Sequence, residues 1–367
     1  MYEEDKKNAS AASPIPTARQ AALLLDWYDQ KRRILPWRED PTPYHVWLSE
    51  IMLQQTRVEA AIGYYERFLK ELPEIRDLAA ADERQYLKLW EGLGYYSRIR
   101  NMHKAAVKVM EDFNGELPSE PAELESLPGI GHYTACAIAS IAFGRRTPAV
   151  DGNLLRVFSR LTLYADELRS AAARKDAEHY YDALFPAERP GDFNQALMDL
   201  GATICLPNGT PHCADCPWKS LCQAHRIGCE EAYPKKTEKA PRKIEKRTIF
   251  LVTSGPLILL RKRPETGLLA GLCEFPGEDG TLTRKKAEDA LSSLGIRPVA
   301  IEKAKPAKHV FSHVEWRMTA WRIEAESLDD FRRDDPGPGE LFAVPLEQLQ
   351  STYPIPSAFA PFLRQLT

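Results

Sequence analysis

The hydrophobic residues of this chain follow a helical period over most of its length and a strand period near its end. From residue 18 to about residue 229 they recur three and four positions apart, as in Trp47, Leu48 and Ile51, and that spacing predicts amphipathic helices. Beyond residue 247 they alternate with polar residues in short runs, which predicts strands. These strands are expected at 248–253, 257–261 and 314–321, with a short helix at about 284–294. The pattern predicts an all-α domain followed by an α+β domain.

A charged segment with two prolines separates these patterns. Residues 231–246 contain Pro234 and Pro241 among many charged side chains, a composition typical of linkers. The basic part, 235–247, fits a solvated tether or a DNA contact. Residues 1–17 are polar, lack the apolar core of a secretory signal, and are predicted to form a disordered tail. The expected domains are therefore 18–230 and 247–367.

Composition and charge limit the classes of protein to which this sequence could belong. The 367 residues are 44% hydrophobic and 28% charged, as in ordinary globular proteins, and the apolar runs are too short to predict a transmembrane helix. The formal net charge of −3 argues against a simple basic scaffold, so a nucleic-acid contact would have to be local and rely on backbone amides. Seven cysteines and no signal sequence favour a reducing cytoplasm over a disulfide framework.

Residues 127–135, with the sequence LPGIGHYTA, form a candidate anion site. Gly129 and Gly131 lie one residue apart after Pro128, just before an apolar helical run. Glycine permits a positive φ and the close approach of a second backbone. We expect a tight turn between two helices, with the amides of Gly129 to His132 pointing outward at a helix N-terminus. Such a turn binds anions, and phosphate is the expected one.

Two carboxyl groups are candidates for acid–base chemistry. Asp151 stands where a helix predicted at 153–163 needs a cap, a position that would lower its pKa through N–H bonds and the helix dipole. Glu50 lies in an apolar helical segment, where desolvation would raise its pKa and suit it to donate a proton. The alternatives are a plain N-cap for Asp151 and a solvent-facing position for Glu50, which the pattern alone favours. A protonated carboxyl beside a charged one is the pair that cleaves glycosidic bonds.

Four of the cysteines crowd into one loop. They are Cys205, Cys213, Cys216 and Cys222, separated by seven, two and five residues. Four thiolates this close can surround a tetrahedral metal or a cubane cluster. Zinc modules usually have two short-spaced pairs with a longer finger between them. The spacing therefore favours a structural [4Fe-4S] cluster over zinc, and either over inert thiols.

The hairpin, the aspartate after it and the cysteine loop resemble the endonuclease III superfamily of helix-hairpin-helix base-excision glycosylases. Within it, four segments closely resemble the adenine DNA glycosylase family. They are LPWR at 35–38, WLSEIMLQQT at 47–56, GLGYYSR at 92–98 and FNQALMDLG at 193–201. The resemblance runs from about residue 18 to the C-terminus. It implies base excision repair in which adenine mispaired with 8-oxoguanine, or with guanine, is removed from double-stranded DNA.

The resemblance implies a role for individual residues. Glu50 would protonate the adenine and handle the water, and Asp151 would stabilise the oxocarbenium ion, with support from Tyr133 and Asn153. The residues implied in the adenine pocket are Trp37, Arg38, Leu53 and Gln195. The residues implied in wedging into the stack and touching the opposite base are Gln55, Thr56, Leu93 and Tyr95. By pattern alone, the polar residues at 54–56 also fit a plain helix end.

Residue 133 distinguishes two branches of the superfamily. Bifunctional members carry a lysine directly after the hairpin, which forms a Schiff base and permits strand cleavage, whereas this chain has Tyr133. The resemblance therefore implies a monofunctional glycosylase. The alternatives are a pyrimidine-damage glycosylase with lyase activity, a non-catalytic lesion sensor and a cluster-based redox module.

The second domain resembles the Nudix fold. Residues 267–277 are similar to its substrate-side segment, with Cys273 where the family usually has tryptophan. The Nudix catalytic box would place two glutamates where this chain has Ser292 and Ser293, and without a carboxylate cage for Mg²⁺ pyrophosphate hydrolysis is not expected. Phe311, Ser312 and His313 resemble the motif that recognises 8-oxoguanine, although by pattern alone they are an ordinary strand end.

The resemblance completes the expected architecture, cofactors and partners. The fold would be an all-α helix-hairpin-helix glycosylase domain in two lobes, with the cluster loop at 205–222, followed by an α+β Nudix-like domain. The first cysteine gap is usually six residues in the superfamily and seven here, a difference that an Asn208–Gly209 turn can absorb. A [4Fe-4S] cluster is implied, and a monovalent or calcium ion at the hairpin is a further candidate. The chain is expected to act as a cytoplasmic, nucleoid-associated monomer on duplex DNA.

Overall fold

The computed structural model describes residues 17–235, 241–334 and 336–366. The described chain forms two compact units. We call residues 17–79 and 101–235 the helical unit, and residues 80–100 and 241–366 the C-terminal unit. Most of the expected tail, 1–17, and five positions of the expected linker, 231–246, lie outside the described residues. Among the described residues, no helix combines the length and apolarity that crossing a membrane requires.

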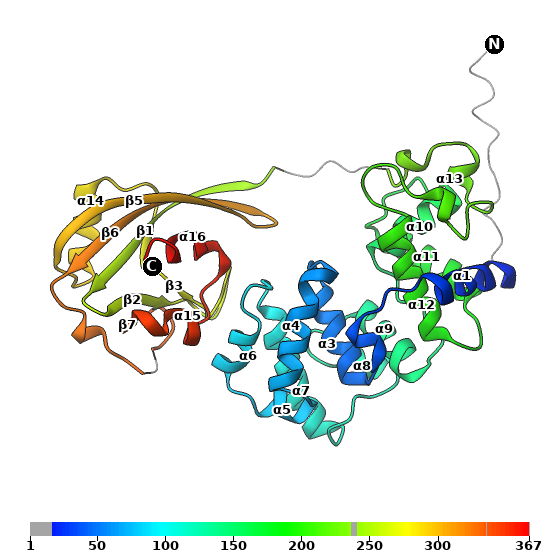
Figure 1. Ribbon diagram of the computed structural model, residues 1–367, viewed down its shortest axis with the longest axis horizontal. Helices are drawn as coiled ribbons and strands as arrows, with labels where there is room; N and C mark the ends of the chain where they lie inside the picture. The colour runs from blue at the N-terminus through cyan, green and yellow to red at the C-terminus, as the bar shows by residue number, and fades with distance from the viewer. Residues whose placement is uncertain (1–16, 236–240, 335, 367) are drawn as a thin grey trace, which may run out of the picture. The chain divides into compact units, whose positions relative to one another are not determined.

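The helical unit confirms the all-α prediction (Figure 1). Its helices, two of which extend into residues 80–100, are α1 (Ala18–Lys31), α2 (Pro36–Glu39), α3 (Pro43–Leu53), α4 (Val58–Glu71), α5 (Ile75–Ala80), α7 (Ser97–Asp112), α8 (Pro121–Glu125), α9 (His132–Phe143), α10 (Gly152–Thr162), α11 (Ala171–Leu184), α12 (Pro190–Asp199) and α13 (Gln223–Arg226). A π-helical turn, Leu200–Ile204, extends α12. One hydrophobic core joins α1, α10, α11 and α12 around the fully buried Tyr181, Phe193 and Trp218.

Helix α9 is the central element of this unit. Its residues from Thr134 to Ser140 are all buried, as expected of a helix that is apolar on every side. It contacts α3, α8 and α12. The contact with α12 requires glycine at position 191, because a Cβ there would lie 2.9 Å from the Ile141 Cα. Helix α9 thereby fixes α3 and α12, which carry Glu50 and Gln195.

The C-terminal unit confirms the α+β prediction. Its strands are β1 (Lys243–Ser254), β2 (Leu257–Lys262), β3 (Cys273–Glu274), β4 (Gly277–Asp279), β5 (Pro298–Val310), β6 (Val314–Ala325) and β7 (Leu341–Pro345). The sheet order is β3-β2-β1-β6-β5, with β4 paired to β1 and β7 to β2. Only the β1–β6 pair is parallel among these strand pairs. The sheet is therefore mixed, as in the Nudix-like domain that the sequence predicted.

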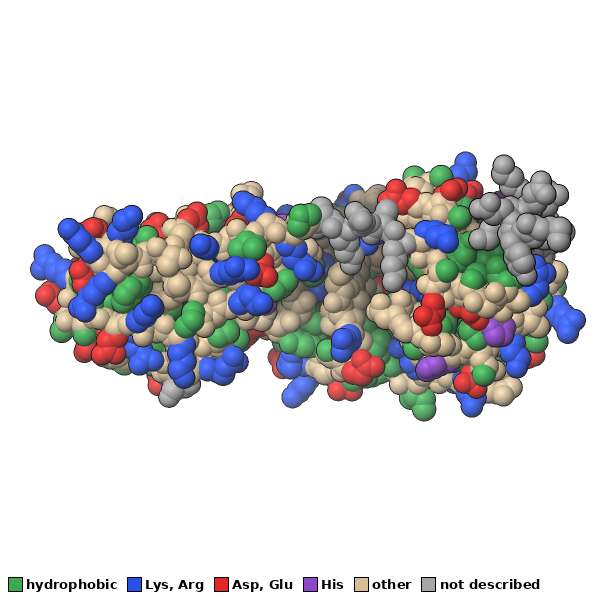
Figure 2. Space-filling model, turned by 90° about the horizontal axis from the view of Figure 1, so that it is seen from above, with side chains coloured by type: hydrophobic (Ala, Val, Ile, Leu, Met, Phe, Trp, Pro, Cys, Tyr) green, Lys and Arg blue, Asp and Glu red, His purple; other side chains and the backbone are tan. Residues whose placement is uncertain are grey.

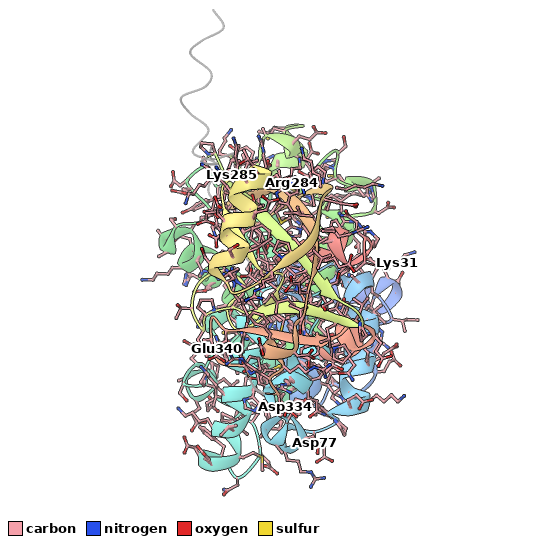
Figure 3. All side chains as sticks on the ribbon, turned by 90° about the vertical axis from the view of Figure 1, so that its left-hand side faces the viewer. Lys31, Asp77, Arg284, Lys285, Asp334 and Glu340 are labelled. Atoms are coloured by element: carbon pink, nitrogen blue, oxygen red, sulfur yellow. The ribbon has the colours of Figure 1, made fainter. Side chains whose placement is uncertain are left out.

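Helices cover both faces of this sheet (Figure 1). Helix α14 (Arg284–Ser293) packs on one face, and it begins at Arg284 and Lys285 as the sequence predicted (Figure 3). The opposite face packs against α15 (Leu349–Thr352) and α16 (Ala360–Leu363). Helix α6 (Glu83–Leu89) belongs to the same unit.

The segment expected to be the end of the linker is part of the sheet instead. Residues 243–246 begin β1, because they pair in parallel with residues 314–317 of β6. This pairing joins residues about 70 positions apart, so the local composition of residues 243–246 could not indicate it. Charged side chains of both signs are interspersed on the face of the molecule that Figure 2 shows, in keeping with the small net charge.

Candidate active site

Glu50 is the buried acid of the site. It lies on α3 with only 7% of its surface exposed, so the solvent-facing alternative is wrong. The Tyr133 hydroxyl, from the first turn of α9, donates a hydrogen bond of 2.7 Å to its Oε2. Desolvation raises the pKa of Glu50 from 4.5 to about 7, against the lowering effect of the Tyr133 bond. Glu50 is thus partly protonated near neutral pH, which suits a general acid.

Asp151 caps α10, as the sequence predicted. Its Oδ1 accepts the backbone N–H groups of Asn153 and Leu154, both at 2.8 Å. Its Oδ2 accepts a 2.8 Å bond from the Asn153 side-chain amide. The expected direction of its pKa shift is wrong, because desolvation raises the pKa of Asp151 and outweighs the lowering effect of these bonds. The caps nevertheless favour the charged form and fix the carboxylate in one orientation.

These two carboxyl groups belong to one site. The charge of Asp151 helps to raise the pKa of both Glu50 and Tyr133. Contact between α3 and α9 brings Glu50 to Tyr133. The structure therefore unites all four predicted catalytic residues, which are Glu50, Tyr133, Asp151 and Asn153. The arrangement offers a proton and an oriented carboxylate, the two groups that glycosidic cleavage needs.

Arg156 and Gly201 support this site, and the sequence reasoning did not select them for that role. Arg156 donates to the Asn153 Oδ1 at 3.0 Å, to the Gly201 carbonyl at 2.7 Å and to the Cys205 carbonyl at 2.8 Å. A Cβ at Gly201 would lie 2.7 Å from the Asn153 Cβ. An arginine three residues after Asn153, one helical turn away, was the available signal.

The predicted adenine-pocket residues fall into two groups. Arg38 and Gln195 line one cavity of about 270 Å³ in the helical unit, together with Tyr28. Trp37 is buried and makes an edge contact with Tyr65, their ring centroids 5.3 Å apart. Leu53 is half-buried at the end of α3. Trp37 and Leu53 do not line that cavity.

Asp199 binds Arg38, which lines this cavity, and the sequence reasoning did not select it for that role. Its carboxylate is 1% exposed and accepts bonds from Arg38 at 2.8 and 3.0 Å and from Arg33 at 2.7 Å. Those arginines hold the pKa of Asp199 below its usual value despite its burial. A buried carboxylate with two arginines fixes the guanidinium planes. Arg38 is thereby oriented at the edge of the cavity.

The hairpin has the expected turn, with one difference. Gly129 has a φ of +80°, and a Cβ there would also lie 2.6 Å from the Asn101 Cβ. Gly131 instead has an extended φ of −92° and serves as the N-cap of α9 without a side-chain cap. The left-handed conformation is therefore required at one glycine of the pair. His132 begins the helix and bonds Glu125 at 2.7 Å.

The four clustered cysteines surround a small cavity of about 30 Å³ in the helical unit. All four are free, half-buried thiols. Arg160 donates to the Cys205 Sγ at 3.1 Å and to the Leu206 carbonyl at 2.9 Å. Four convergent thiols with a cation beside one of them are a donor set that fits an anionic iron–sulfur cluster. His225 and Glu230 lie close enough to Cys213 to belong to the same surroundings.

A second large cavity lies in the C-terminal unit. We call it the C-terminal cavity; its volume is about 680 Å³, and its lining includes residues 92–97, 267–270 and 309–313. It unites Leu93 and Tyr95 with Phe311, Ser312 and His313, which the sequence presents as two separate motifs. Tyr95 is half-exposed with a φ of +48°. Gln55, also left-handed at +62°, and Thr56 follow α3 in the helical unit.

Comparisons with known proteins agree with this geometry. Residues 48–181 match the model of the HhH-GPD superfamily of base excision DNA repair proteins, and residues 248–365 match that of the NUDIX domain. The adenine DNA glycosylase of Rattus norvegicus is 37% identical over 361 residues, covering 83% of this chain and 70% of that protein. That of Homo sapiens is 36% identical over 374 residues, covering 86% and 68%. That of Buchnera aphidicola subsp. Acyrthosiphon pisum is 33% identical over 324 residues, covering 85% and 89%.

A solved structure supports the same fold. A thermostable thymine-DNA glycosylase superposes with a TM-score of 0.53 and 27% identity, covering 57% of this chain and 97% of that one. The helical fold and the hairpin define a base-excision DNA glycosylase of the helix-hairpin-helix class. The chain belongs to the adenine DNA glycosylase family, as its similarity over most of its length to these relatives shows. It is an enzyme that hydrolyses N-glycosidic bonds, and the resemblance read from the sequence is confirmed.

Proposed function

We propose that this enzyme excises adenine paired with 8-oxoguanine from double-stranded DNA and leaves the DNA strand unbroken. The observation that carries the proposal is the Glu50–Tyr133 pair in one site with the Asp151 carboxylate, which caps α10 and accepts bonds from Asn153. A neutral carboxyl that donates a proton and a charged one that stabilises a cation are what departure of a neutral purine requires.

The chemistry divides between the two carboxyls. The protonated form of Glu50, which a pKa of about 7 keeps populated near neutral pH, donates its proton to a ring nitrogen of the flipped adenine. The glycosidic C–N bond then breaks, its electron pair leaves with the base, and the sugar becomes an oxocarbenium ion. The Asp151 carboxylate stabilises that ion by its charge or by a covalent bond to the sugar. Water adds to the anomeric carbon, and its proton returns to the Glu50 carboxylate, restoring the starting state.

Tyr133 supports the claim that the enzyme is monofunctional. A phenol cannot form a Schiff base, and the Tyr133 hydroxyl is already hydrogen-bonded to Glu50. Cleavage of the phosphodiester would need an amine to retain the sugar covalently. A duplex with a labelled adenine strand tests this. We expect full-length strand after neutral work-up and a cleaved strand only after hot alkali; nicking without alkali would support the glycosylase/lyase alternative.

The rate of adenine release should depend on pH through both carboxyls. Because the proton donor is Glu50 with a pKa of about 7, the single-turnover rate should fall about tenfold per pH unit well above that value. On the acid side it should fall as Asp151, whose pKa is also raised, takes up a proton. A rate that keeps rising between neutral and alkaline pH would contradict the role of Glu50.

The remaining predicted residues would bind the DNA. Gly129 and Gly131 would present backbone amides to a phosphate, alone or with a monovalent or calcium ion. Trp37, Arg38, Leu53 and Gln195 would hold the extruded adenine, and flipping costs a few kcal/mol that wedging side chains help to offset. The wedging residues would be Gln55, Thr56, Leu93 and Tyr95. In the C-terminal cavity, Phe311, Ser312 and His313 would recognise 8-oxoguanine. A monomer supplies all of these groups.

A [4Fe-4S] cluster would be held by Cys205, Cys213, Cys216 and Cys222. When bound, it would order this loop, which Arg156 and Arg160 of α10 contact through the Cys205 carbonyl, the Cys205 Sγ and the Leu206 carbonyl. The protein purified from cells should be brown and contain about four iron atoms per chain. A C213S variant should lose most of this iron, whereas C229S, a thiol that does not line the cysteine cavity, should keep it. Stoichiometric zinc in the wild type would contradict the assignment.

A further inference from the structure

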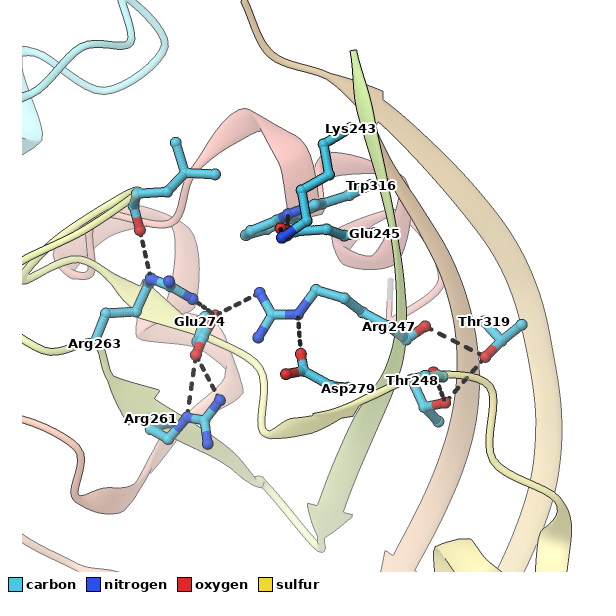
Figure 4. Close-up of polar contacts among 12 residues, drawn as sticks. Lys243, Glu245, Arg247, Thr248, Arg261, Arg263, Glu274, Asp279, Trp316 and Thr319 are labelled. Carbon is cyan, nitrogen blue, oxygen red and sulfur yellow. Dashed lines mark hydrogen bonds and ion pairs between the residues drawn. The ribbon is translucent and has the colours of Figure 1, made fainter. Parts of the chain in front are cut away.

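A buried ion-pair cluster lies in the C-terminal unit and takes no part in the chemistry described above. At its centre Glu274, on β3, is 2% exposed. Arg261 bonds its Oε1 at 2.7 and 3.1 Å, Arg263 bonds its Oε2, and Arg247 lies 3.8 Å from the same oxygen (Figure 4). Because Arg247 also pairs with the exposed Asp279 at 3.7 Å, Arg261 and Arg263 are the two arginines held mainly by Glu274, one more than its charge requires (Figure 4). A further purpose for one of them is therefore expected.

Arg263 connects this cluster to a loop that forms one wall of the C-terminal cavity. Its Nε donates a 3.0 Å bond to the carbonyl of Leu268, and residues 267–270 line the cavity. The loop is closed at its base by backbone bonds from Arg263 to Leu272 and from Gly271 to Pro264, both at 2.9 Å. The guanidinium therefore supplies an anchor in the middle of the loop.

The same guanidinium also reaches a second part of the cavity lining, residues 309–313, through a series of aromatic contacts. It lies 5.7 Å from the ring centroid of Trp316, and Arg247 lies 4.4 Å from that ring. Trp316 is 2% exposed and donates a 3.0 Å bond to Glu245 (Figure 4). The ring centroids of Trp316 and Phe311 are 5.0 Å apart, and those of Phe311 and His309 are 4.6 Å apart. Cation–π and edge-to-face contacts of this kind favour one orientation of each ring.

We propose that Arg263 is a positioning residue for recognition of the base opposite adenine, because it holds two walls of the C-terminal cavity through Leu268 and Trp316. Glu274 fixes the plane of the Arg263 guanidinium by a charge-assisted bond, so that one side chain serves both walls. Loss of this anchor leaves the fold of the sheet but loosens Phe311 and the 267–270 loop. The inference rests on the proposed function, since it assigns the C-terminal cavity to the opposite base.

Arg261 provides a matched control. It belongs to the same cluster and pairs with the same carboxylate, but among the described residues its guanidinium bonds Glu274 alone, and it does not line the cavity. An R261M variant removes one of the positive charges that pair with Glu274, as R263M does. A general loss of stability would appear in both variants, whereas a loss of positioning would appear only in R263M.

The test is the ratio of single-turnover rates on 8-oxoguanine:adenine and guanine:adenine duplexes, measured with the full chain. R263M should lower this ratio roughly tenfold or more, a size typical of a lost recognition contact, and R261M should leave it within about twofold of the wild type. R263K should lower it too, because one ammonium keeps the ion pair but cannot replace the planar guanidinium. If R263M is unfolded at the assay temperature, R263K decides the same question.

Three outcomes have different meanings. A wild-type ratio of one would mean that the proposed function itself has failed. A wild-type preference for 8-oxoguanine that R263M and R263K both retain would overturn the inference alone. An equal loss in R261M and R263M would also overturn it, because that effect belongs to the ion-pair cluster as a whole. Binding of duplexes with an uncleavable abasic analogue opposite either base should follow the same pattern.

Discussion

Replacing Asp151 by asparagine should reduce single-turnover release of adenine by roughly 10²–10³-fold, the loss expected when a group that stabilises transition-state charge is removed. Asparagine is as good an N-cap as aspartate, so α10 should still begin at the same place. The new side-chain NH₂ group would face the NH₂ group of Asn153, whose orientation is held by the Arg156 bond to its Oδ1. Two donors would then face each other, which should cost about 1–3 kcal/mol of stability. Release of adenine from labelled duplex measures the rate.

D82N is the matched control for this variant. Asp82 caps α6 of the C-terminal unit and accepts a 2.9 Å bond from the Gln85 N–H, so it has the same cap chemistry without being one of the catalytic carboxyls. It should leave adenine release within about twofold of the wild type. Affinity for the 8-oxoguanine duplex should survive in both variants. A D151N enzyme with near wild-type turnover would remove Asp151 from the mechanism.

Replacing Glu50 by glutamine should lower adenine release by roughly 10²–10⁴-fold, the usual contribution of a general acid. The same change should stabilise the protein at alkaline pH. Burial raises the pKa of Glu50 from 4.5 to about 7, so the favourable contribution of the neutral carboxyl is complete below 4.5 and is lost as the pH rises through 7. The charged form then costs on the order of 3 kcal/mol. Glutamine has no charge and avoids this cost.

The predicted loss of adenine release and the predicted gain in stability at alkaline pH are measured separately. The free energy of unfolding of E50Q should match the wild type near pH 4 and exceed it at pH 8. Y133F gives an independent check, because the Tyr133 bond lowers the pKa of Glu50. Loss of this hydrogen bond should raise the pKa of Glu50 and so move the alkaline limb of the rate profile to higher pH. An E50Q protein that is inactive but no more stable at pH 8 would show that Glu50 is not buried as a costly charge.

Local sequence patterns were sufficient to predict most of the secondary-structure elements and the motifs. The cap at Asp151, the left-handed turn at Gly129 and the cysteine group all depend on residues close in sequence. The same holds for the helix that begins at Arg284. Period and turn chemistry are local properties, so sequence alone can indicate them. The burial of Glu50 is different, because it depends on α9 packing against α3.

The features that sequence reasoning missed are set by tertiary packing. Asp199 meets Arg33 and Arg38 across more than 160 residues, and Arg156 meets Cys205 across 49. The raised pKa of Asp151 has the same origin, since desolvation by surrounding elements outweighs its local hydrogen bonds. The union of Tyr95 with Phe311 in one cavity likewise follows from the fold. Such features have no local period or composition that could indicate them.

Release of free adenine under single-turnover conditions, from duplexes that place 8-oxoguanine, guanine or thymine opposite the adenine, tests the central claim most directly. We expect fast release opposite 8-oxoguanine, slower release opposite guanine and no release opposite thymine, with the sugar–phosphate strand intact until alkali is added. Equal rates opposite 8-oxoguanine and thymine, or no free adenine from the 8-oxoguanine duplex, would contradict the account.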